Sequence, residues 1–274
     1  MQNIKEIFIE IEMEESYPKL DFGFNLLNSK LTKMTLPSII SISGPIAKGK
    51  TSFVLNMVLS LAKSKANILY ITSKEKPTSI AKKLLSIDSS ISCDRIFRRS
   101  NAEEKNKIEV SRNTLSESNL YIAEIGHNEQ ESEQIENAIN VFINNFKEKV
   151  VVIYDEYNNN LETLIALKRI TAKEKVMIFL VSRINGNPFI TFNHFLSKMP
   201  VELEQNSDCI IGIQRKKVEK RKENKDYLFA HIYKIKEDSL CTIKYEFNNK
   251  NLRLEEIEKV SEKELYKLCD EMLI

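Results

Sequence analysis

Apolar positions along this chain fall into two alternating patterns. Short apolar runs rich in β-branched residues have the length of buried strands, and they lie at residues 37–43, 67–72, 118–125, 149–157 and 175–182. Between these runs, apolar residues recur every three to four positions, which is the spacing of one helix face. Strands that are apolar throughout are buried on both faces, as in a parallel sheet covered by helices. The pattern therefore predicts an α/β fold with a central, mainly parallel sheet.

The segments with helical spacing follow the predicted strands in turn. They are residues 53–62, 77–87, 135–146 and 161–167. Pro77 suits the first turn of its helix, because a backbone N–H at that position has no partner within the helix. We expect these helices to cover both faces of the sheet.

The last third of the chain has a different pattern. Apolar runs at residues 209–214, 227–236 and 240–247 follow one another without helical segments between them, which predicts antiparallel strands at the C-terminal edge of the sheet. Ser261 and Glu264 have the spacing of a capping box, which predicts a short helix after them. The expected regions are an N-terminal extension at residues 1–30, the main domain at 31–255 and the C-terminal helix at 256–274.

Composition and charge narrow the class of protein. The chain has 274 residues, of which 42% are hydrophobic, and a net charge of +2. These values are typical of a globular protein without a strong overall attraction for nucleic acid or membrane. The four cysteines show no metal-ligand spacing, the first residues are too acidic for a signal peptide, and no apolar run has membrane-spanning length. We therefore expect a soluble, cytoplasmic protein without a membrane partner.

The segment GPIAKGKTS contains two of the chain's six glycines. Gly44, Gly49, Lys50 and Thr51 match the P-loop pattern G-x-x-x-x-G-K-[ST], and a predicted strand and helix flank the segment as a P-loop requires. In this motif the backbone surrounds phosphates, Lys50 reaches the β- and γ-phosphates, and the Thr51 hydroxyl holds Mg²⁺. The alternative is a turn that matches by chance. The residues expected to bind the nucleotide are Gly44, Pro45, Ile46, Ala47, Lys48, Gly49, Lys50, Thr51 and Ser52.

A second carboxylate is needed to position Mg²⁺ beside a P-loop. The apolar run at 149–157 ends in Asp155 and Glu156. Because ligands collect at the carboxyl ends of parallel strands, Asp155 is expected to join Thr51 at the metal site. Apolar residues followed by an aspartate are common in buried strands, so this signal gains its weight from the P-loop.

The order of these motifs resembles the RecA-type ATPase domain of the DnaB family of replicative helicases. The resemblance runs from about Asp21 to Leu254, and it rests on residues 38–75, 165–185, 201–213 and 231–247. Its most specific parts are the last segment, a hairpin, and Glu204, Gln205 and Asp208, which match the family's Glu-Gln-x-x-Asp. The resemblance implies a RecA-like P-loop NTPase fold, the cofactors ATP and Mg²⁺, and a homo-oligomer such as a hexameric ring. Single-stranded DNA and another replication protein are the implied partners.

The resemblance also assigns catalytic positions. The family's catalytic glutamate, which orients the attacking water, follows the second strand. An ungapped comparison puts Lys74 at that place, and Glu75 takes it with a shift of one residue. An ammonium group there would abolish hydrolysis while leaving ATP binding intact. Glu156 is a weaker candidate for the same role.

Three further basic residues receive roles from the resemblance. Arg183 stands where the family has a sensor glutamine, so it contacts a γ-phosphate or forms a surface ion pair. Lys234 and Lys236 replace the Lys-x-Arg finger that enters the neighbouring subunit's site, without the arginine's bidentate fork. The alternative for the two lysines is a solvated sheet edge.

The function remains open between two classes. An ATP-dependent DNA helicase of DnaB type, acting on single-stranded DNA in replication, fits the P-loop, Asp155 and the finger lysines. A helicase-derived ATP-binding regulator or assembly factor fits Lys74 and the short segment after Asp155, which replaces a longer DNA-binding loop. A RecA- or RadA-like recombination ATPase fits the strand order, but it fits the Glu-Gln-x-x-Asp segment less well.

Two other segments each have two interpretations. Residues 215–225 include seven basic residues, which contact a nucleic-acid backbone or form a solvated hairpin loop. Residues 189–195 include three phenylalanines and a histidine, which stack on bases or pack against the sheet.

Overall fold

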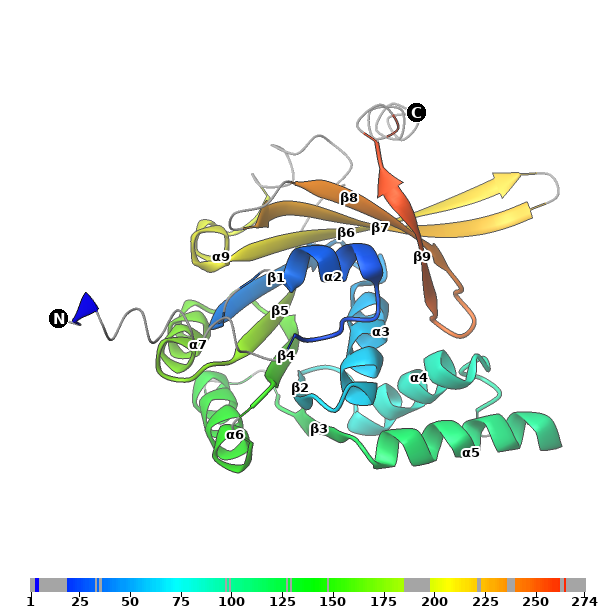
Figure 1. The fold of residues 1–274 in the computed structure, drawn as a ribbon, viewed down its shortest axis with the longest axis horizontal. Helices are drawn as coiled ribbons and strands as arrows, with labels where there is room; N and C mark the ends of the chain where they lie inside the picture. The colour runs from blue at the N-terminus through cyan, green and yellow to red at the C-terminus, as the bar shows by residue number, and fades with distance from the viewer. Residues whose placement is uncertain are drawn as a thin grey trace.

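The fold is built on one nine-stranded sheet (Figure 1). In this computed structural model the described residues are 3–4, 19–32, 34, 36–96, 98, 100–126, 128, 130–146, 148–184, 198–220, 223–235, 240–261 and 264. The order of strands in the sheet is β3-β2-β4-β5-β1-β6-β7-β8-β9. Strands β1 to β5 and the start of β6 pair in parallel, and β6 to β9 pair antiparallel. The predicted mixed sheet, with antiparallel strands at its C-terminal edge, is therefore confirmed.

The strands lie close to the apolar runs of the sequence. They are β1 (Ser38–Gly44), β2 (Asn67–Thr72), β3 (Asn119–Glu124), β4 (Val150–Tyr157), β5 (Met177–Arg183), β6 (Cys209–Lys220), β7 (Glu223–Ile235), β8 (Cys241–Phe247) and β9 (Leu254–Val260). The described helices are α2 (Asn25–Leu31), α3 (Lys50–Lys63), α4 (Pro77–Ser89), α5 (Ala102–Ser116), α6 (Glu131–Asn145), α7 (Leu161–Lys173) and α9 (Val201–Asn206).

Helices cover both faces of the parallel strands, as expected. Apolar residues of α2, α3 and α4 share one buried cluster, and those of α6 and α7 share a second. Along β1, Ile40 and Ile42 belong to the first cluster and Ile39 to the second, because successive side chains of a strand point to opposite faces. The sheet therefore separates two apolar layers.

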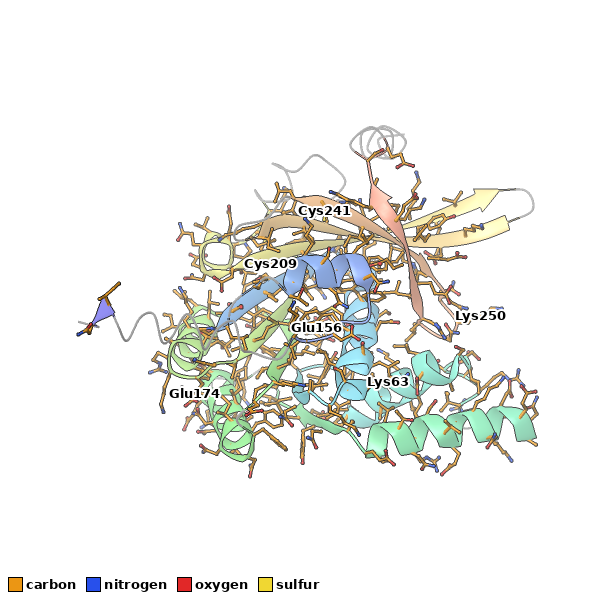
Figure 2. All side chains as sticks on the ribbon, viewed as in Figure 1. Lys63, Glu156, Glu174, Cys209, Cys241 and Lys250 are labelled. Atoms are coloured by element: carbon orange, nitrogen blue, oxygen red, sulfur yellow. The ribbon has the colours of Figure 1, made fainter. Side chains whose placement is uncertain are left out.

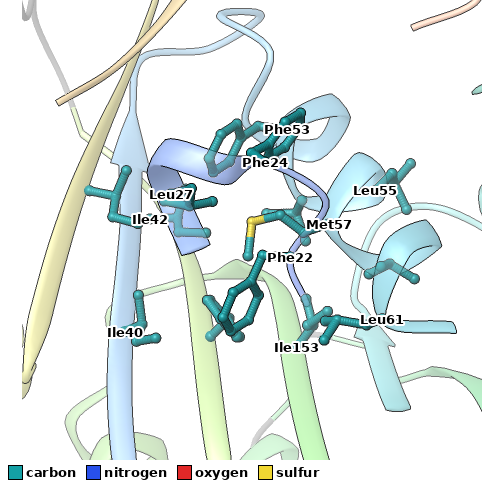
Figure 3. Close-up of a cluster of buried hydrophobic side chains, with 14 of the residues drawn as sticks. Phe22, Phe24, Leu27, Ile40, Ile42, Phe53, Leu55, Met57, Leu61 and Ile153 are labelled. Carbon is teal, nitrogen blue, oxygen red and sulfur yellow. The ribbon is translucent and has the colours of Figure 1, made fainter. Parts of the chain in front are cut away.

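Part of the expected N-terminal extension belongs to this core. Phe22, Phe24 and Leu27 are buried beside Phe53 (Figure 3). The ring of Phe24 lies 4.8 Å from that of Tyr245, centroid to centroid, in an edge-on arrangement. The boundary expected at residue 31 is therefore misplaced, since the apolar side chains of residues 20–31 complete the layer above α3.

Phe22 offers a direct test of this packing. It is fully buried, and its ring lies edge-on to Phe179 of β5 at 5.8 Å. We expect Phe22→Ala to lower the free energy of unfolding by about 3–5 kcal/mol, because it leaves a cavity in the core. Val141→Ala, at an exposed position of α6, should change it by about 0.5 kcal/mol or less. Urea denaturation followed by circular dichroism measures both, and equally small losses would show that residues 20–31 are an appendage.

The C-terminal boundary also differs from expectation. Strand β9 extends to Val260, so the first residues of the helix expected at 256–274 are strand. Ser261 and Glu264 make the predicted capping contact, with Glu264 N donating to Ser261 Oγ at 3.3 Å. The remainder of that helix lies outside the described residues. Strand β9 and helix α5 were not predicted, because their apolar residues are sparse and many of their side chains are exposed.

The basic run at 215–225 lies largely in strands rather than in a solvated loop. Strand β6 continues to Lys220 and β7 begins at Glu223, with pairing between the two along the whole length. Arg215 Nε donates to Asp226 Oδ1 at 2.8 Å, so part of the positive charge is neutralised within the hairpin. The aromatic run at 189–195 lies outside the described residues.

Candidate nucleotide-binding site

The loop between β1 and α3 has the backbone that its two glycines predict. Gly49 has φ +91°, a left-handed conformation that side chains disfavour, and it is the N-cap of α3. A Cβ atom on Gly44 would lie 2.4 Å from the carbonyl oxygen of Ile213 in β6. Among the described residues, no side chain caps the first turn of α3. The free N–H groups and the helix dipole of this turn are therefore available to an anion.

Lys50 points back over the loop. Its side chain is almost fully buried, and its Nζ donates to the carbonyl oxygen of Pro45 at 2.8 Å. Burial lowers the pKa of Lys50, and the nearby carboxylates of Glu156 and Asp155 oppose part of that shift. The ammonium group is thus held inside the loop, where a phosphate would replace the Pro45 carbonyl as its partner.

Thr51 and Asp155 meet at the carboxyl ends of the strands, as the sequence predicts. Thr51 Oγ1 donates to Asp155 Oδ2 at 3.0 Å, and the Tyr70 hydroxyl donates to the same oxygen at 2.6 Å. Asp155 is 3% exposed, and its Oδ1 has no hydrogen-bond partner within the described part of the chain. Burial raises the pKa of Asp155, while the hydrogen bonds from Tyr70 and Thr51 act against the rise.

This donor set fits Mg²⁺. The hydroxyl of Thr51 and the unpartnered oxygen of Asp155 are hard oxygen ligands, which this ion prefers, directly or through water. Tyr70 was missed by the sequence analysis, because a tyrosine in the run NILYIT is indistinguishable from a core residue. Its role follows from the pairing of β2 with β4.

Glu156 lies in a backbone irregularity just after Asp155 (Figure 2). The pairing of β4 with β5 shifts between Asp155 and Tyr157, and Glu156 has φ +71°. Its carboxylate is paired with Lys74 Nζ. Burial raises the pKa of Glu156, but the hydrogen bond and charge of Lys74 outweigh it and hold the pKa below its usual value.

Glu75, the expected catalytic glutamate, is bound to α4. Thr72 Oγ1 donates to the carbonyl oxygen of Glu75 at 3.0 Å and accepts from its N–H at 3.1 Å, which fixes a turn after β2. The Glu75 carboxylate accepts from Ser79 Oγ at 2.9 Å and from Lys83 Nζ at 2.6 Å. Lys74 therefore reaches across to β4, while Glu75 is held by helix side chains.

The remaining basic candidates lie in two places. Arg183 ends β5 opposite Gly44, so it borders the P-loop. Lys234 lies near the other end of the sheet, where its Nζ donates to the carbonyl oxygen of Glu204 at 2.9 Å. Lys236 lies outside the described residues. The fold thus gathers Lys50, Thr51, Asp155, Glu156, Lys74 and Arg183 and leaves Lys234 apart.

The Glu-Gln-x-x-Asp segment lies at that same distant end. Asp208 Oδ2 accepts from Ile39 N at 2.9 Å, and Asp208 N donates to the Ile39 carbonyl at 2.8 Å. These bonds tie the segment after α9 to the start of β1. Within the described ranges, no helix combines the length and apolarity required to cross a membrane.

Comparison with known proteins agrees with this geometry. The family model for the DnaB-like helicase C terminal domain matches residues 20–175, more than half of the chain. Among curated proteins, no significant match was found. Two solved structures resemble the whole fold. The first is of an isolated ATPase domain, which aligns with 17% identity and a TM-score of 0.74, covering 93% of this chain and 97% of that one.

The second structure is of a DnaB-like replicative helicase and its interactions with primase. It aligns with 16% identity and a TM-score of 0.73, covering 93% of this chain and 66% of the longer helicase chain. At such identities the two structures support the fold, and the family model supports the membership. The chain belongs to the family of DnaB-like helicase C-terminal domains.

Proposed function

We propose that this chain binds ATP with Mg²⁺ in the loop at residues 44–52 and hydrolyses it to drive a helicase of DnaB type along single-stranded DNA. The observation that carries the proposal is the hydrogen bond between Thr51 and Asp155 next to the inward-facing Lys50, with Asp155 Oδ1 left unpartnered among the described residues. These residues form a matched site for a phosphate chain and its metal ion. The setting is DNA replication in the cytoplasm.

Each residue of the site has a distinct task in this proposal. The first turn of α3 and the loop N–H groups bind the phosphates, and Lys50 leaves Pro45 to neutralise the outer ones. Thr51 and Asp155 hold Mg²⁺, which supplies charge neutralisation on the phosphates when it is bound. Arg183 lies at the rim of the loop, where it can contact the γ-phosphate. Asp155 is held in place by Tyr70.

The active assembly is proposed to be a ring of identical subunits, such as a hexamer. Lys234 and Lys236 are two residues apart on or beside β7, and Lys234 lies far along the sheet from the loop of its own chain. A cation in that position can complete a site only on a neighbouring subunit. One similar solved structure concerns a helicase and its interactions with primase, and we propose a replication protein of that kind as a partner.

Mixing of variants tests the shared site. Lys50→Ala subunits lack a functional loop, and Lys234→Ala subunits lack one finger lysine. If sites are completed between subunits, oligomers containing both variants have some intact interfaces and should regain part of the ATPase activity that each variant lacks. Lys107→Ala, on the exposed face of α5, is the control and should retain full activity alone. Demonstrably mixed oligomers without any recovery would refute the assignment of Lys234.

The proposed function itself is tested by ATP hydrolysis with and without single-stranded DNA, on a sample whose mass in solution is known. An oligomer whose turnover rises with DNA supports the motor. A monomer, or an oligomer indifferent to DNA, contradicts it.

A second function is favoured by two features of the site. Both candidate carboxylates are paired with lysines, Glu156 with Lys74 and Glu75 with Lys83. Only residues 158–160 lie between β4 and α7, which leaves little chain for contact with DNA. A regulator or assembly factor that binds ATP without DNA-stimulated turnover would have these features, and the same assay distinguishes it.

A further inference from the structure

We infer that Glu156, rather than Glu75, is the carboxylate that orients the attacking water at the γ-phosphate and accepts its proton. This inference rests on the proposed function, because it assigns a role within the proposed ATPase site. It concerns the position at which this chain departs most from the family, since Lys74 stands where the catalytic glutamate is expected.

The backbone at Glu156 is the first reason. A bulge between Asp155 and Tyr157 interrupts the pairing with β5, and it places Glu156 at φ +71°. A glutamate rarely adopts this left-handed conformation, and its free-energy cost must be offset by surrounding contacts. Bulges next to active sites turn a side chain from one direction to another. Here the bulge redirects the side chain that follows the proposed metal ligand.

The charges around Lys50 are the second reason. Among the described residues, Glu156 acts on Lys50 more strongly than any other charge, ahead of Asp155. Lys50 and Arg183 in turn act on Glu156. Glu156 therefore lies close to the ammonium group that would contact the γ-phosphate. Glu75 is instead engaged by Ser79 and Lys83 on α4, and the turn made with Thr72 fixes its backbone.

Lys74 is the positioning residue for Glu156. Its side chain is 47% exposed and that of Glu156 is 30% exposed, so their ion pair is accessible to water and contributes little to stability. The negative charge of a bound triphosphate would compete with Glu156 for Lys74, and this competition would free the carboxylate. The water oxygen then forms a bond to the γ-phosphorus, the bond to the bridging oxygen of ADP breaks, and the water proton passes to Glu156 and afterwards to the released phosphate.

The test compares two matched substitutions, Glu156→Gln and Glu75→Gln, in the full chain with single-stranded DNA. Glu156→Gln should reduce ATP turnover by about 100-fold or more, the usual contribution of a general base. Its affinity for a non-hydrolysable ATP analogue should be equal to or higher than that of the wild type, because a negative charge near the phosphates is lost. Nucleotide recovered from the protein after incubation with ATP should be mainly ATP for Glu156→Gln and mainly ADP for wild type and Glu75→Gln.

A third variant separates catalysis from support of the fold. Lys74→Met removes the ion pair but keeps the carboxylate, so it should weaken analogue binding while turnover at saturating ATP persists. Turnover lost in Glu75→Gln and kept in Glu156→Gln would overturn the inference while leaving the proposed function intact. A wild type that binds the analogue but never hydrolyses ATP would overturn both. Loss of analogue binding in Glu156→Gln would show that this glutamate supports the loop instead.

Discussion

Replacing Lys50 with alanine should weaken ATP binding by about 100- to 1000-fold. Lys50 is the one loop cation whose ammonium group is buried against the loop carbonyls, in the place where the β- and γ-phosphates are expected. Removing one partner of a buried charged contact costs about 2–5 kcal/mol, and each 1.4 kcal/mol corresponds to a tenfold change in affinity. Binding is measured by isothermal titration calorimetry with a non-hydrolysable analogue and Mg²⁺.

Lys48→Ala is the matched control for that experiment. Lys48 belongs to the same loop but is less buried than Lys50, so the same change in net charge should cost at most about tenfold. Because burial lowers the pKa of Lys50, its charge is a burden on the unliganded fold, and Lys50→Ala should melt no earlier than wild type. Equal losses of affinity in both variants would reduce the role of Lys50 to general electrostatic attraction.

Asp155→Asn should have opposite effects on nucleotide binding and on stability. Loss of the carboxylate charge should raise the Mg²⁺ concentration needed for ATP binding by about 100-fold or more, since even residues that only orient a metal ligand contribute about 10- to 100-fold. The unliganded variant should melt at a higher temperature, because burial penalises the charged form of Asp155. Metal titrations that overlay those of wild type would refute the assignment.

The pH dependence of that stability gain has a definite sign. Burial raises the pKa of Asp155 in the folded state above its ordinary value of 3.8, so ionisation destabilises the fold as the pH rises above 3.8. The gain from Asp155→Asn should therefore be largest near neutral pH and should shrink as the pH falls towards 3.8. Thermal melts of both proteins over this range measure the difference.

The sequence was informative where the pattern is dense. The continuous apolar strands and the P-loop predicted the parallel sheet, and the position of Asp155 at the end of its run predicted its meeting with Thr51. The basic run at 215–225 misled, because charged side chains on alternate positions of a two-stranded ribbon resemble a solvated loop. The N-terminal boundary was misplaced because residues 20–31 make their core contacts with β5 and β8, far away in the chain.

The details of the site depended on tertiary structure. No pattern distinguishes Tyr70 from a core residue until β2 pairs with β4. Whether Lys74 or Glu75 takes the place after β2 was ambiguous by one residue, and the hydrogen bonds of Thr72 decide how that turn is made. The bulge at Glu156 arises from the register of β4 against β5, which the local sequence does not express.

A crystal structure with Mg²⁺ and a non-hydrolysable ATP analogue tests the central claim most directly. The account predicts a triphosphate enclosed by residues 44–52, with Lys50 Nζ moved from the Pro45 carbonyl to the outer phosphates and Mg²⁺ on Thr51 Oγ1 beside Asp155. A nucleotide bound elsewhere, or a loop left empty at saturating analogue with Lys50 still bonded to Pro45, would contradict it.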